Sequence, residues 1–253
     1  MATPESESFV RTFARGLRVI EVMGQSTGRQ NMAQISEAAQ LPRTVVRRLL
    51  LTLIELGFVG SDDKDYWLTP KVLRLGMTYL YTLPFWRQSQ MVLEELGTRI
   101  KQSCAVSVLD DGDIVYIQRF HTKRILAFSP SIGSRLPAYS VSMGKVLLSG
   151  LRDDKLDAYL EQTEFTALTP HTVIEKEKLR TIITQVRDQS YSWSDAEYDD
   201  SICGLAVPIR GHGGEIVAAI NVSLISGEFT EEQARSEFLP LLKLAASRLK
   251  QTD

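Results

Sequence analysis

Residues 41–56 read L-P-R-T-V-V-R-R-L-L-L-T-L-I-E-L and are followed by Gly57. This stretch decides the fold of the first part of the chain, because it has the pattern of one amphipathic helix. Pro42 suits the first turn, where its missing N–H costs no hydrogen bond, and Gly57 suits the left-handed position after a helix end. Apolar residues at three- and four-residue spacing are predicted to form a core stripe: Val45, Val46, Leu49, Leu53 and Leu56.

The opposite face of this predicted helix carries cations near its N-terminal end. Arg43 and Arg47 are four residues apart, as are Thr44 and Arg48, so both pairs stack on the side away from the core stripe. Arginines in the first two turns favour a helix that enters the major groove of DNA N-terminus first. Taken alone, the same residues also fit an ordinary core helix with a solvated charged face.

The neighbouring segments favour the DNA-reading interpretation. Residues 9–23 and 32–39 have helical spacing, with Asn31 as a candidate N-cap, so the arginine helix becomes the third helix after a tight turn. Residues 58–59 and 66–68 are strand-like and flank an aspartate-rich turn, which predicts a hairpin wing. Lys64 at the tip of that wing is a candidate contact to phosphate or to a neighbouring minor groove; the alternative is a bare surface turn.

Charge is unevenly distributed along the chain. The 253 residues carry a formal net charge of −2, but residues 9–60 hold seven arginines against three glutamates, a local charge of +4. A basic footprint on a nearly neutral protein is typical of a DNA-binding module. Arg11 and Arg15 of the first predicted helix are weaker candidates for contacts to the DNA backbone or the minor groove.

Length, cysteines and hydropathy limit the broad class of the protein. A chain of 253 residues suits two domains, each able to bury a core. Cys104 and Cys203 have neither a disulfide pattern nor a zinc-ligand spacing, so we expect a reduced cytoplasm. The polar, acidic N-terminus is unlike a signal peptide, and no apolar run approaches a membrane span, so no membrane partner is expected.

Residues 71–83 are apolar on nearly every side, which indicates that this segment packs against a second copy of the chain. Pro84 interrupts the run, and residues 85–102 resume as an amphipathic helix. We therefore expect a DNA-binding domain over residues 1–70, a linker helix over residues 71–85, and a second domain over residues 86–253.

The second domain is predicted to be α+β with a mostly antiparallel sheet covered by helices. Alternation with a period of two predicts strands, and the remaining amphipathic segments predict helices. The predicted strands are residues 105–109, 114–120, 124–128, 191–194, 204–210 and 216–224, and the predicted helices are residues 142–149, 155–162, 175–189 and 231–250.

Catalysis finds little support in this domain. His121, His171 and His212 are scattered, and the phosphate-binding, dinucleotide-binding and nucleophile-elbow motifs are missing. The carboxylates of residues 195–200 fit a metal or acid–base site, or a solvated loop. A small-molecule-processing enzyme with a fused helical module therefore remains the alternative to a regulator.

Small and polar residues gather in residues 133–137, 195–204 and 218–223, which is the composition of a pocket for a small polar ligand. Asn221 and Ser223 alternate with apolar residues and so point to the same face of one strand. The alternative is that both face water.

Several strings, in this order, resemble the IclR family of bacterial transcriptional regulators over essentially the whole chain. They are R-G-L-R-V-I-E at 15–21, the arginine-helix stretch, W-L-T-P-K-V-L-R-L-G at 67–76, L-P-A-Y-S-V-S-M-G-K-V-L-L at 136–148, A-V-P-I-R at 206–210 and A-A-I-N-V-S at 218–223. The strings F-V-R-T-F-A-R-G-L, Y-L-Y-T-L-P-F-W and F-L-P-L-L resemble the branch that governs aromatic-acid degradation through the β-ketoadipate pathway.

The resemblance implies a winged helix-turn-helix domain, an effector domain related to GAF-type sensors, and homodimers or homotetramers on palindromic operators in double-stranded DNA. It implies a small organic acid as effector and no cofactor. In that branch the loop usually reads D-Q-E-x-x-x-G-L-R-S-I-A-V-P; here Asp195 and Glu197 match, Ser201 replaces the glycine and Cys203 replaces the arginine.

With this resemblance, we expect residues 86–253 to bind an organic anion, most simply an aromatic carboxylate. Ser134, Asn221 and Ser223 are expected to supply hydrogen bonds, together with backbone N–H groups around Gly133 and Gly204. Leu136, Met143 and Ile202 are expected to line the apolar part. Because Cys203 stands where the branch has arginine, Arg119 or Arg135 is the candidate counter-charge.

Overall fold

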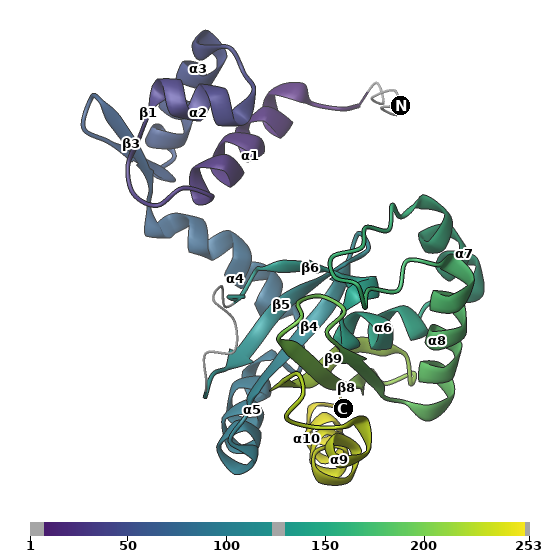
Figure 1. Cartoon of the computed structure of the whole chain (residues 1–253). Helices are drawn as coiled ribbons and strands as arrows, with labels where there is room; N and C mark the ends of the chain where they lie inside the picture. The colour runs from purple at the N-terminus through teal and green to yellow at the C-terminus, as the bar shows by residue number, and fades with distance from the viewer. Residues whose placement is uncertain (1–7, 123–129, 251–253) are drawn as a thin grey trace. The chain divides into compact units, whose positions relative to one another are not determined.

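The computed structural model describes residues 8–122 and 130–250 of the chain. The chain forms two compact units, one ending at Thr82 and the other beginning at Leu83 (Figure 1). Each unit has a buried apolar core of its own.

The N-terminal unit combines helices with a small antiparallel sheet in which the strand order is β1-β3-β2. Its elements in chain order are α1 (Arg11–Gly24), β1 (Gln30–Asn31), α2 (Met32–Ala39), α3 (Arg43–Glu55), β2 (Val59–Ser61), β3 (Asp65–Leu68), the 3-10 helix η1 (Pro70–Val72) and α4 (Leu73–Thr82). The predicted helix-turn-helix followed by a hairpin is therefore present.

Helix α2 is held at both ends by local hydrogen bonds. The Asn31 side chain accepts from the backbone N–H groups of Ala33 and Gln34 at 3.0 and 3.1 Å, and the Gln34 side chain accepts from the Asn31 backbone at 2.9 Å. This reciprocal capping box satisfies backbone donors that the first helical turn leaves free. Gln40 ends the helix in the left-handed conformation with φ 54°, which turns the chain directly toward α3. The N-cap prediction for Asn31 is confirmed.

Helix α3 begins and ends as its terminal residues dictate. Pro42 is the N-cap residue, and its carbonyl oxygen accepts from the backbone N–H groups of Val45 and Val46 at 2.9 and 3.0 Å. Gly57 follows the helix with φ 77°, a conformation that favours glycine. The predicted helix and its left-handed terminal glycine are both observed.

The core of this unit differs in one place from the stripe predicted for residues 41–56, and α1 buries one end only. Leu56 is 51% exposed because α3 ends one residue earlier and the chain then leaves the helix axis, and Leu50 is buried instead. In α1, Phe13 and Leu17 are 68% and 43% exposed, and the buried face is formed by later residues of the helix. These core-facing residues are Val19, Val22 and Met23.

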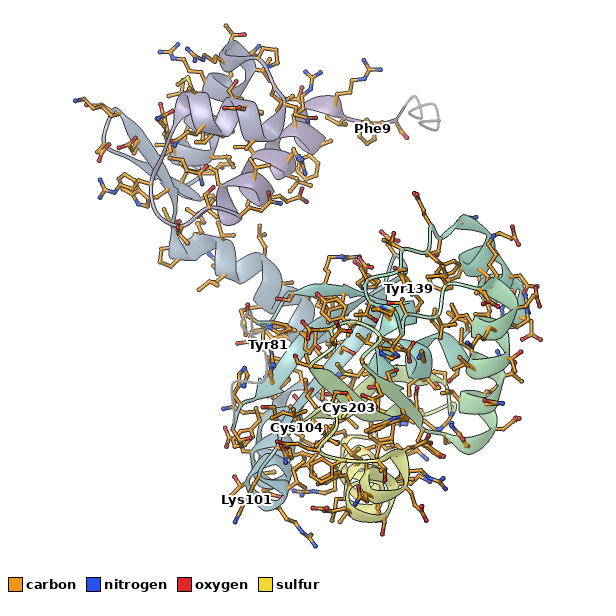
Figure 2. All side chains as sticks on the ribbon, viewed as in Figure 1. Phe9, Tyr81, Lys101, Cys104, Tyr139 and Cys203 are labelled. Atoms are coloured by element: carbon orange, nitrogen blue, oxygen red, sulfur yellow. The ribbon has the colours of Figure 1, made fainter. Side chains whose placement is uncertain are left out.

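Exposed apolar side chains also gather on α4, where Leu73 and Tyr81 are the most exposed, at 70% and 63%. Figure 2 labels two of the exposed aromatic side chains of the N-terminal unit, Phe9 and Tyr81. The exposed apolar side chains on α1 and α4 form more uncovered apolar surface than is usual for a helix that faces water.

The wing is a β2–β3 hairpin, as predicted, with Val59 opposite Leu68. Two features stiffen it. The Arg29 guanidinium lies 4.1 Å from the centroid of the Trp67 ring and pairs with Asp62. Gly60 lies under the same ring, so a Cβ there would lie 2.5 Å from Trp67 ring atoms. The pairing of β1 with β3 was not predicted, because two residues are too few to show a period.

Within the described residues, the C-terminal unit contains a six-stranded antiparallel sheet with strand order β6-β5-β4-β9-β8-β7, and helices cover both faces. Helices α6, α7 and α8 lie on one side, and α5, α9 and α10 lie on the other (Figure 1). Its elements are α5 (Trp86–Ile100), β4 (Ser103–Asp110), β5 (Asp113–Phe120), β6 (Arg135–Pro137), η2 (Ala138–Ser140), α6 (Ser142–Ser149), α7 (Asp153–Gln162), α8 (Lys176–Gln189), β7 (Ser192–Asp195), β8 (Ile202–Arg210), β9 (Ile216–Ile225), α9 (Glu231–Glu237) and α10 (Leu239–Leu249). The predicted α+β fold with an antiparallel sheet is confirmed.

Two segments of this unit differ from prediction. The last helix is not continuous: α9 ends before Phe238, and Pro240, which lacks an N–H, lies in the first turn of α10. Strand β6 was not predicted, because its three residues, one of them a proline, are too few to show a period. The strand predicted at residues 124–128 lies outside the described residues.

Candidate functional site

The arginine face of α3 is exposed along its whole length. Arg43, Thr44, Arg47 and Arg48 are all exposed, while Val46 and Leu49 on the other side are buried. Among the residues that the structure describes, Arg43, Arg47 and Arg48 form no ion pair. Three guanidinium groups are therefore free to donate hydrogen bonds outward, and arginine can present two parallel N–H groups to one acceptor.

The remaining predicted DNA contacts lie on α1 and on the wing. Arg11 and Arg15 are exposed on α1. Lys64 is exposed in the turn between β2 and β3, beside Asp63, which has φ 74°. In the same turn Asp62 is engaged by Arg29 and by the backbone N–H of Asp65, and these hydrogen bonds lower its pKa. The ion pair with Arg29 offsets the negative charge of Asp62 near Lys64.

A cavity lies in the C-terminal unit, over the sheet face that α6 covers. Its volume is about 60 Å³. One water molecule needs about 10–15 Å³ by the same measure, so the cavity has room for a small ligand only. The residues that line it are Tyr116, Arg119, Pro130, Leu136, Ser140, Val141, Ser142, Met143, Ser194, Glu197, Tyr198, Ile202, Cys203, Gly204, Asn221 and Ser223. Seven of the ten residues predicted for the effector are therefore brought together here: Arg119, Leu136, Met143, Ile202, Gly204, Asn221 and Ser223.

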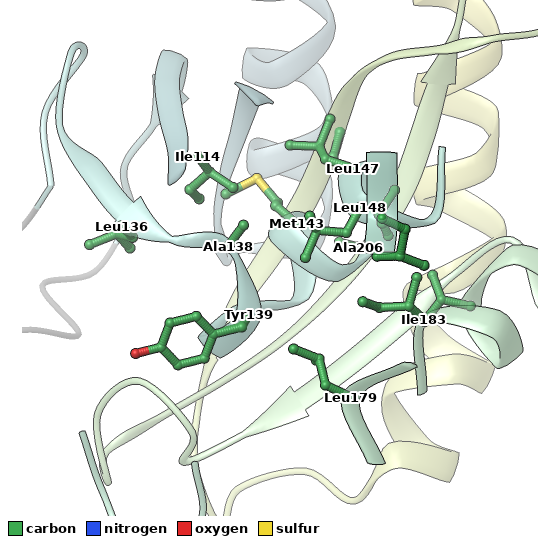
Figure 3. Packing of buried hydrophobic residues seen from close by; sticks show 14 of the residues in the cluster. Ile114, Leu136, Ala138, Tyr139, Met143, Leu147, Leu148, Leu179, Ile183 and Ala206 are labelled. Atoms are coloured by element: carbon green, nitrogen blue, oxygen red, sulfur yellow. The ribbon is translucent and has the colours of Figure 1, made fainter. Parts of the chain in front are cut away.

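Helix α6 forms one wall of this cavity, and a glycine sets its position. A Cβ on Gly144 would lie 2.5 Å from the carbonyl carbon of Ala138 and closer still to its oxygen, so the helix packs directly on the η2 backbone. Met143 is buried in the core cluster shown in Figure 3 and accepts a hydrogen bond at Sδ from Ser107 Oγ at 3.2 Å. The close approach of α6 thus brings Met143 to the wall of the cavity.

The sheet supplies a row of residues that faces α6. Arg119 on β5 pairs with Ala105 on β4, Ala105 pairs with Asn221 on β9, and Asn221 pairs with Ala206 on β8. Directly opposite residues project from the same face of a sheet. Arg119 and Asn221 thus share this face with two alanines, and the small alanine side chains leave the open space above the sheet.

Arg119 is the positively charged residue among those that line the cavity. Its Nη1 donates to the carbonyl oxygen of Pro130, its guanidinium lies 5.6 Å from the centroid of the Tyr116 ring, and burial lowers its pKa. No carboxylate pairs with it among the described residues. Arg135, the other predicted counter-charge, does not line the cavity, because Asp110 and Asp113 bind its side chain and raise its pKa.

Gly133 and Ser134 also lie outside the cavity. They form a turn beside β5, in which the Gly133 N–H donates to the Tyr116 carbonyl oxygen at 2.7 Å. Ser134 Oγ accepts from the backbone N–H of Ser131 at 2.9 Å. Both residues thus have local structural contacts, and the positive φ of 88° at Gly133 suits this turn.

A buried ion pair lies beside the cavity, and its acidic member, Glu197, lines the space. The Lys145 ammonium on α6 contacts Glu197 Oε1 and donates to Ser194 Oγ at 3.1 Å. Lys145 is 1% exposed, and burial lowers its pKa while Glu197 opposes that shift. Glu197 was expected in a loop, and Lys145 was not predicted. A single lysine inside an otherwise apolar helix was the available signal, since a buried lysine needs an acidic partner.

Asn221 and Ser223 face the cavity rather than water. Asn221 Nδ2 donates to Ser223 Oγ at 3.1 Å, which agrees with the prediction that both side chains share one face. Gly204 lies beside them, and a Cβ there would lie 3.1 Å from Ser142 Oγ. The serines of η2 and α6 were not predicted, because a hydroxyl in a helix carries no sequence signal for a ligand.

Cys203 replaces the branch arginine, and its side chain is engaged on the sheet. Its Sγ donates to the Ile225 carbonyl oxygen at 3.5 Å, and burial raises its pKa to about 12. The thiol therefore stays neutral at ordinary pH and supplies no counter-charge. Figure 2 labels this residue together with Cys104, the other buried thiol.

The acidic loop is held by hydrogen bonds rather than arranged as a metal site. Asp195 accepts from Ser226 Oγ at 2.7 Å, and Asp199 accepts from the Ser201 backbone at 2.9 Å. Residues 8–122 and 130–250 bring together no group of three or more histidine, cysteine or acidic side chains suited to a metal ion. Within the same ranges, no helix has both the length and the apolar character needed to cross a bilayer.

Two family models match the chain. One, described as the IclR helix-turn-helix domain, matches residues 12–63, and the other, described as the bacterial transcriptional regulator IclR C-terminal domain, matches residues 77–251. The chain is 39% identical over 241 residues to the Pca regulon regulatory protein of Pseudomonas putida, covering 95% of this chain and 82% of that protein.

Solved structures agree with these matches. The chain is 40% identical to a candidate transcriptional regulator from Rhodococcus sp. RHA1, with a TM-score of 0.84 and coverage of 95% of this chain and 97% of that one. It is 27% identical to the inducer-binding domain of a double mutant of the PobR transcription factor from Acinetobacter, solved with 3-hydroxybenzoic acid. That match has a TM-score of 0.60 and covers 64% of this chain and 95% of that one.

Proposed function

The chain belongs to the IclR family of bacterial transcriptional regulators, and from that premise we propose how its residues bind DNA and an effector. It is a DNA-binding transcriptional regulator of the aromatic-catabolism branch of that family. The observation that carries the proposal is the exposed face of α3, where three arginines have no acidic partner among the described residues. The enzyme alternative is set aside, because the family and the relatives reported above are regulators.

Arg43, Thr44, Arg47 and Arg48 are proposed to read base edges or phosphates in the major groove. Arginine suits this role because its fork matches the paired acceptors of guanine. Arg11 and Arg15 would contact the backbone or the minor groove, and Lys64 would bring the wing tip to a phosphate. We propose residues 1–70 as the DNA-binding domain and residues 71–85 as the linker.

The functional form is proposed to be a homodimer, or a homotetramer built from dimers, on a palindromic operator in the cytoplasm. Two observations support it. Leu73 and Tyr81 leave α4 with exposed apolar surface, and Phe13 and Leu17 do the same on α1. Two reading heads would meet half-sites about one helical turn, roughly 34 Å, apart.

Residues 86–253 are proposed to bind a small aromatic carboxylate in the cavity over β4, β5 and β9. Arg119 would face the carboxylate, since it is the cation of the cavity and has no acidic partner among the described residues. Leu136, Met143 and Ile202 would contact the ring. The PobR inducer-binding domain solved with 3-hydroxybenzoic acid supports this ligand class.

Effector binding is proposed to act through the geometry of the dimer. A ligand that prefers one arrangement of the two reading heads changes DNA affinity by its differential affinity for the two arrangements, and by no more. Gly133 and Ser134 have no proposed ligand contact, because both are engaged in the turn beside β5.

DNase footprinting on the DNA that flanks the gene of this protein, together with metal analysis of the purified chain, tests the regulator proposal. We expect protection of two related half-sites. A stoichiometric metal with no footprint would instead support an enzyme.

Calorimetric titration tests the cavity. Benzoate-type, cinnamate-type and short aliphatic acids would be titrated into the full chain, and the small cavity favours the benzoate-type over the longer cinnamate-type acids. Failure of all three classes to bind would contradict the effector proposal, as would unchanged binding after Asn221 and Ser223 are both replaced by alanine.

A further inference from the structure

Residues 196–201, which connect β7 to β8 and which we call the lid, lie between the cavity and solvent. On the inner side of the lid, Glu197 and Tyr198 line the cavity. On its outer side, Asp200 is exposed. The lid is therefore one wall of the cavity and has its other face in water.

The cavity is smaller than the class of ligand proposed for it. Its volume of about 60 Å³ corresponds to roughly four to six water molecules, which is less space than an aromatic carboxylate occupies. At least one wall must therefore move when such a ligand enters. Helix α6 is fixed by the contact of Gly144 with the Ala138 backbone, and β5 and β9 are each paired with a strand on both sides.

The lid is held differently, because side chains from another segment bind its backbone. Thr169 and Thr172 lie between α7 and α8. Thr169 Oγ1 donates to the carbonyl oxygen of Ala196, and Thr172 Oγ1 donates to that of Glu197, both at 2.6 Å. The two threonines are 8% and 9% exposed, and neither of them lines the cavity. A hydroxyl has one proton to donate, and both threonines donate it to the lid.

A third contact reaches the same part of the lid from α6. The buried Lys145 ammonium contacts Glu197 Oε1, so all three contacts meet on Ala196 and Glu197. Ala196 has φ 55°, in the left-handed region, which is unfavourable for a residue with a Cβ. Such a backbone persists only where its surroundings hold it. We therefore expect Ala196 to leave this conformation when the threonine hydrogen bonds break.

We propose that the lid opens to admit the effector, and that Thr169 and Thr172 are positioning residues that latch it and so set the rate of ligand exchange without contacting the ligand. This inference rests on the effector binding proposed above and adds the residues that control access to the cavity. Loss of both hydroxyls leaves two carbonyl oxygens of the lid without these donors and lets Ala196 relax, so the lid opens more often.

The first test needs no ligand and measures hydrogen–deuterium exchange of residues 195–202 in the full chain. T169V/T172V removes both hydroxyls at nearly constant side-chain volume, whereas T169S/T172S retains them. We expect exchange about fivefold or more faster in the valine variant, because a hydrogen bond contributes roughly this factor, and exchange close to wild type in the serine variant. T181V is the control, since Thr181 Oγ1 donates to the Glu177 carbonyl oxygen within α8.

The second test measures ligand exchange by stopped-flow mixing with 4-hydroxybenzoate and with benzoate. T169V/T172V is expected to bind and release the acid about tenfold faster than wild type, with a smaller change in equilibrium affinity, because the latch lies outside the ligand contacts. A purely structural role would lower the melting temperature without raising the association rate. Circular dichroism verifies folding, and T169V alone replaces the double variant if the latter does not fold.

Lid exchange or an association rate equal to wild type in the folded valine variant would overturn the inference. Equal acceleration in T169S/T172S would overturn it as well, because that variant retains both hydroxyls. If neither acid binds to wild type, the aromatic-acid proposal loses its support, and the exchange measurement without ligand still decides whether the two threonines latch the lid.

Discussion

Gly144 of α6 packs so closely on Ala138 of η2 that there is no room for a methyl group between them. This contact sets the depth at which the two flanking side chains enter the protein. Met143 reaches the cavity, and Lys145 reaches the buried Glu197. The short string S-M-G-K therefore places two parts of the site through one glycine.

Replacing Gly144 by alanine is expected to destabilise the C-terminal unit by about 1–3 kcal/mol, because the new Cβ meets backbone atoms that cannot rotate away. Thermal and urea unfolding measure the change. Gly76→Ala is the control, since a Cβ there meets no atom within 4 Å and alanine favours the helix. A G144A protein as stable as wild type would contradict the packing described for α6.

Arg47→Ala is expected to weaken specific DNA binding by about 1–3 kcal/mol if the guanidinium reads a base edge. If it contacts a phosphate instead, the loss should be similar across DNA sequences and the salt dependence should decrease. Arg99→Ala, an exposed arginine on α5, is the matched control and should bind as wild type does. Fluorescence anisotropy at several salt concentrations separates the cases, and unchanged affinity in all of R43A, R47A and R48A would exclude this face.

Asn31→Ala is expected to cost about 1 kcal/mol of stability in the N-terminal unit, because two backbone N–H groups of α2 lose their acceptor. Asn31→Ser should restore most of it, since serine supplies a side-chain oxygen at the N-cap. Urea unfolding of the three proteins makes the comparison. Equal losses for alanine and serine would show that the cap is not the cause.

Because the thiol of Cys104 is buried, we expect the protein to lose stability in alkaline solution. Burial raises the pKa of its thiol from 9.0 to about 12. Below pH 9 the thiol is protonated in both states, but from about pH 9 to 12 the unfolded chain ionises first, so the free energy of unfolding falls as pH rises. Burial also raises the pKa of Tyr116, and it lowers that of Lys145. Because several groups titrate in this range, the contribution of the thiol is isolated by comparing wild type with Cys104→Val. The free energy of unfolding in urea should decrease less between pH 8 and pH 10 in the variant than in wild type.

The N-terminal unit was largely predictable because its signals are local. Pro42, Gly57 and Asn31 act within a few residues of themselves, and the exposed arginine face follows from helical spacing alone. The predicted core position of Leu56 was wrong, because spacing identifies an apolar face without showing what, if anything, covers it.

The cavity was predictable only in part. Asn221 and Ser223 could be placed on one face by alternation, which the hydrogen bond between them supports. The pairing of Lys145 with Glu197 joins residues 52 positions apart in the chain, and no periodic pattern reports a contact of that kind. Arg119 and Arg135 could not be distinguished by sequence, since the difference between them is that Asp110 and Asp113 bind the second.

The most direct test of the account is the affinity of the full-length protein for the operator next to its own gene, measured by anisotropy with and without saturating 4-hydroxybenzoate. We expect specific binding at half-sites roughly 34 Å apart and a clear change in affinity when the ligand is present, because the ligand prefers one dimer geometry. Specific binding that is identical with and without every aromatic acid shown to occupy the cavity would contradict the central claim, which is that the cavity controls how the arginine helices meet DNA.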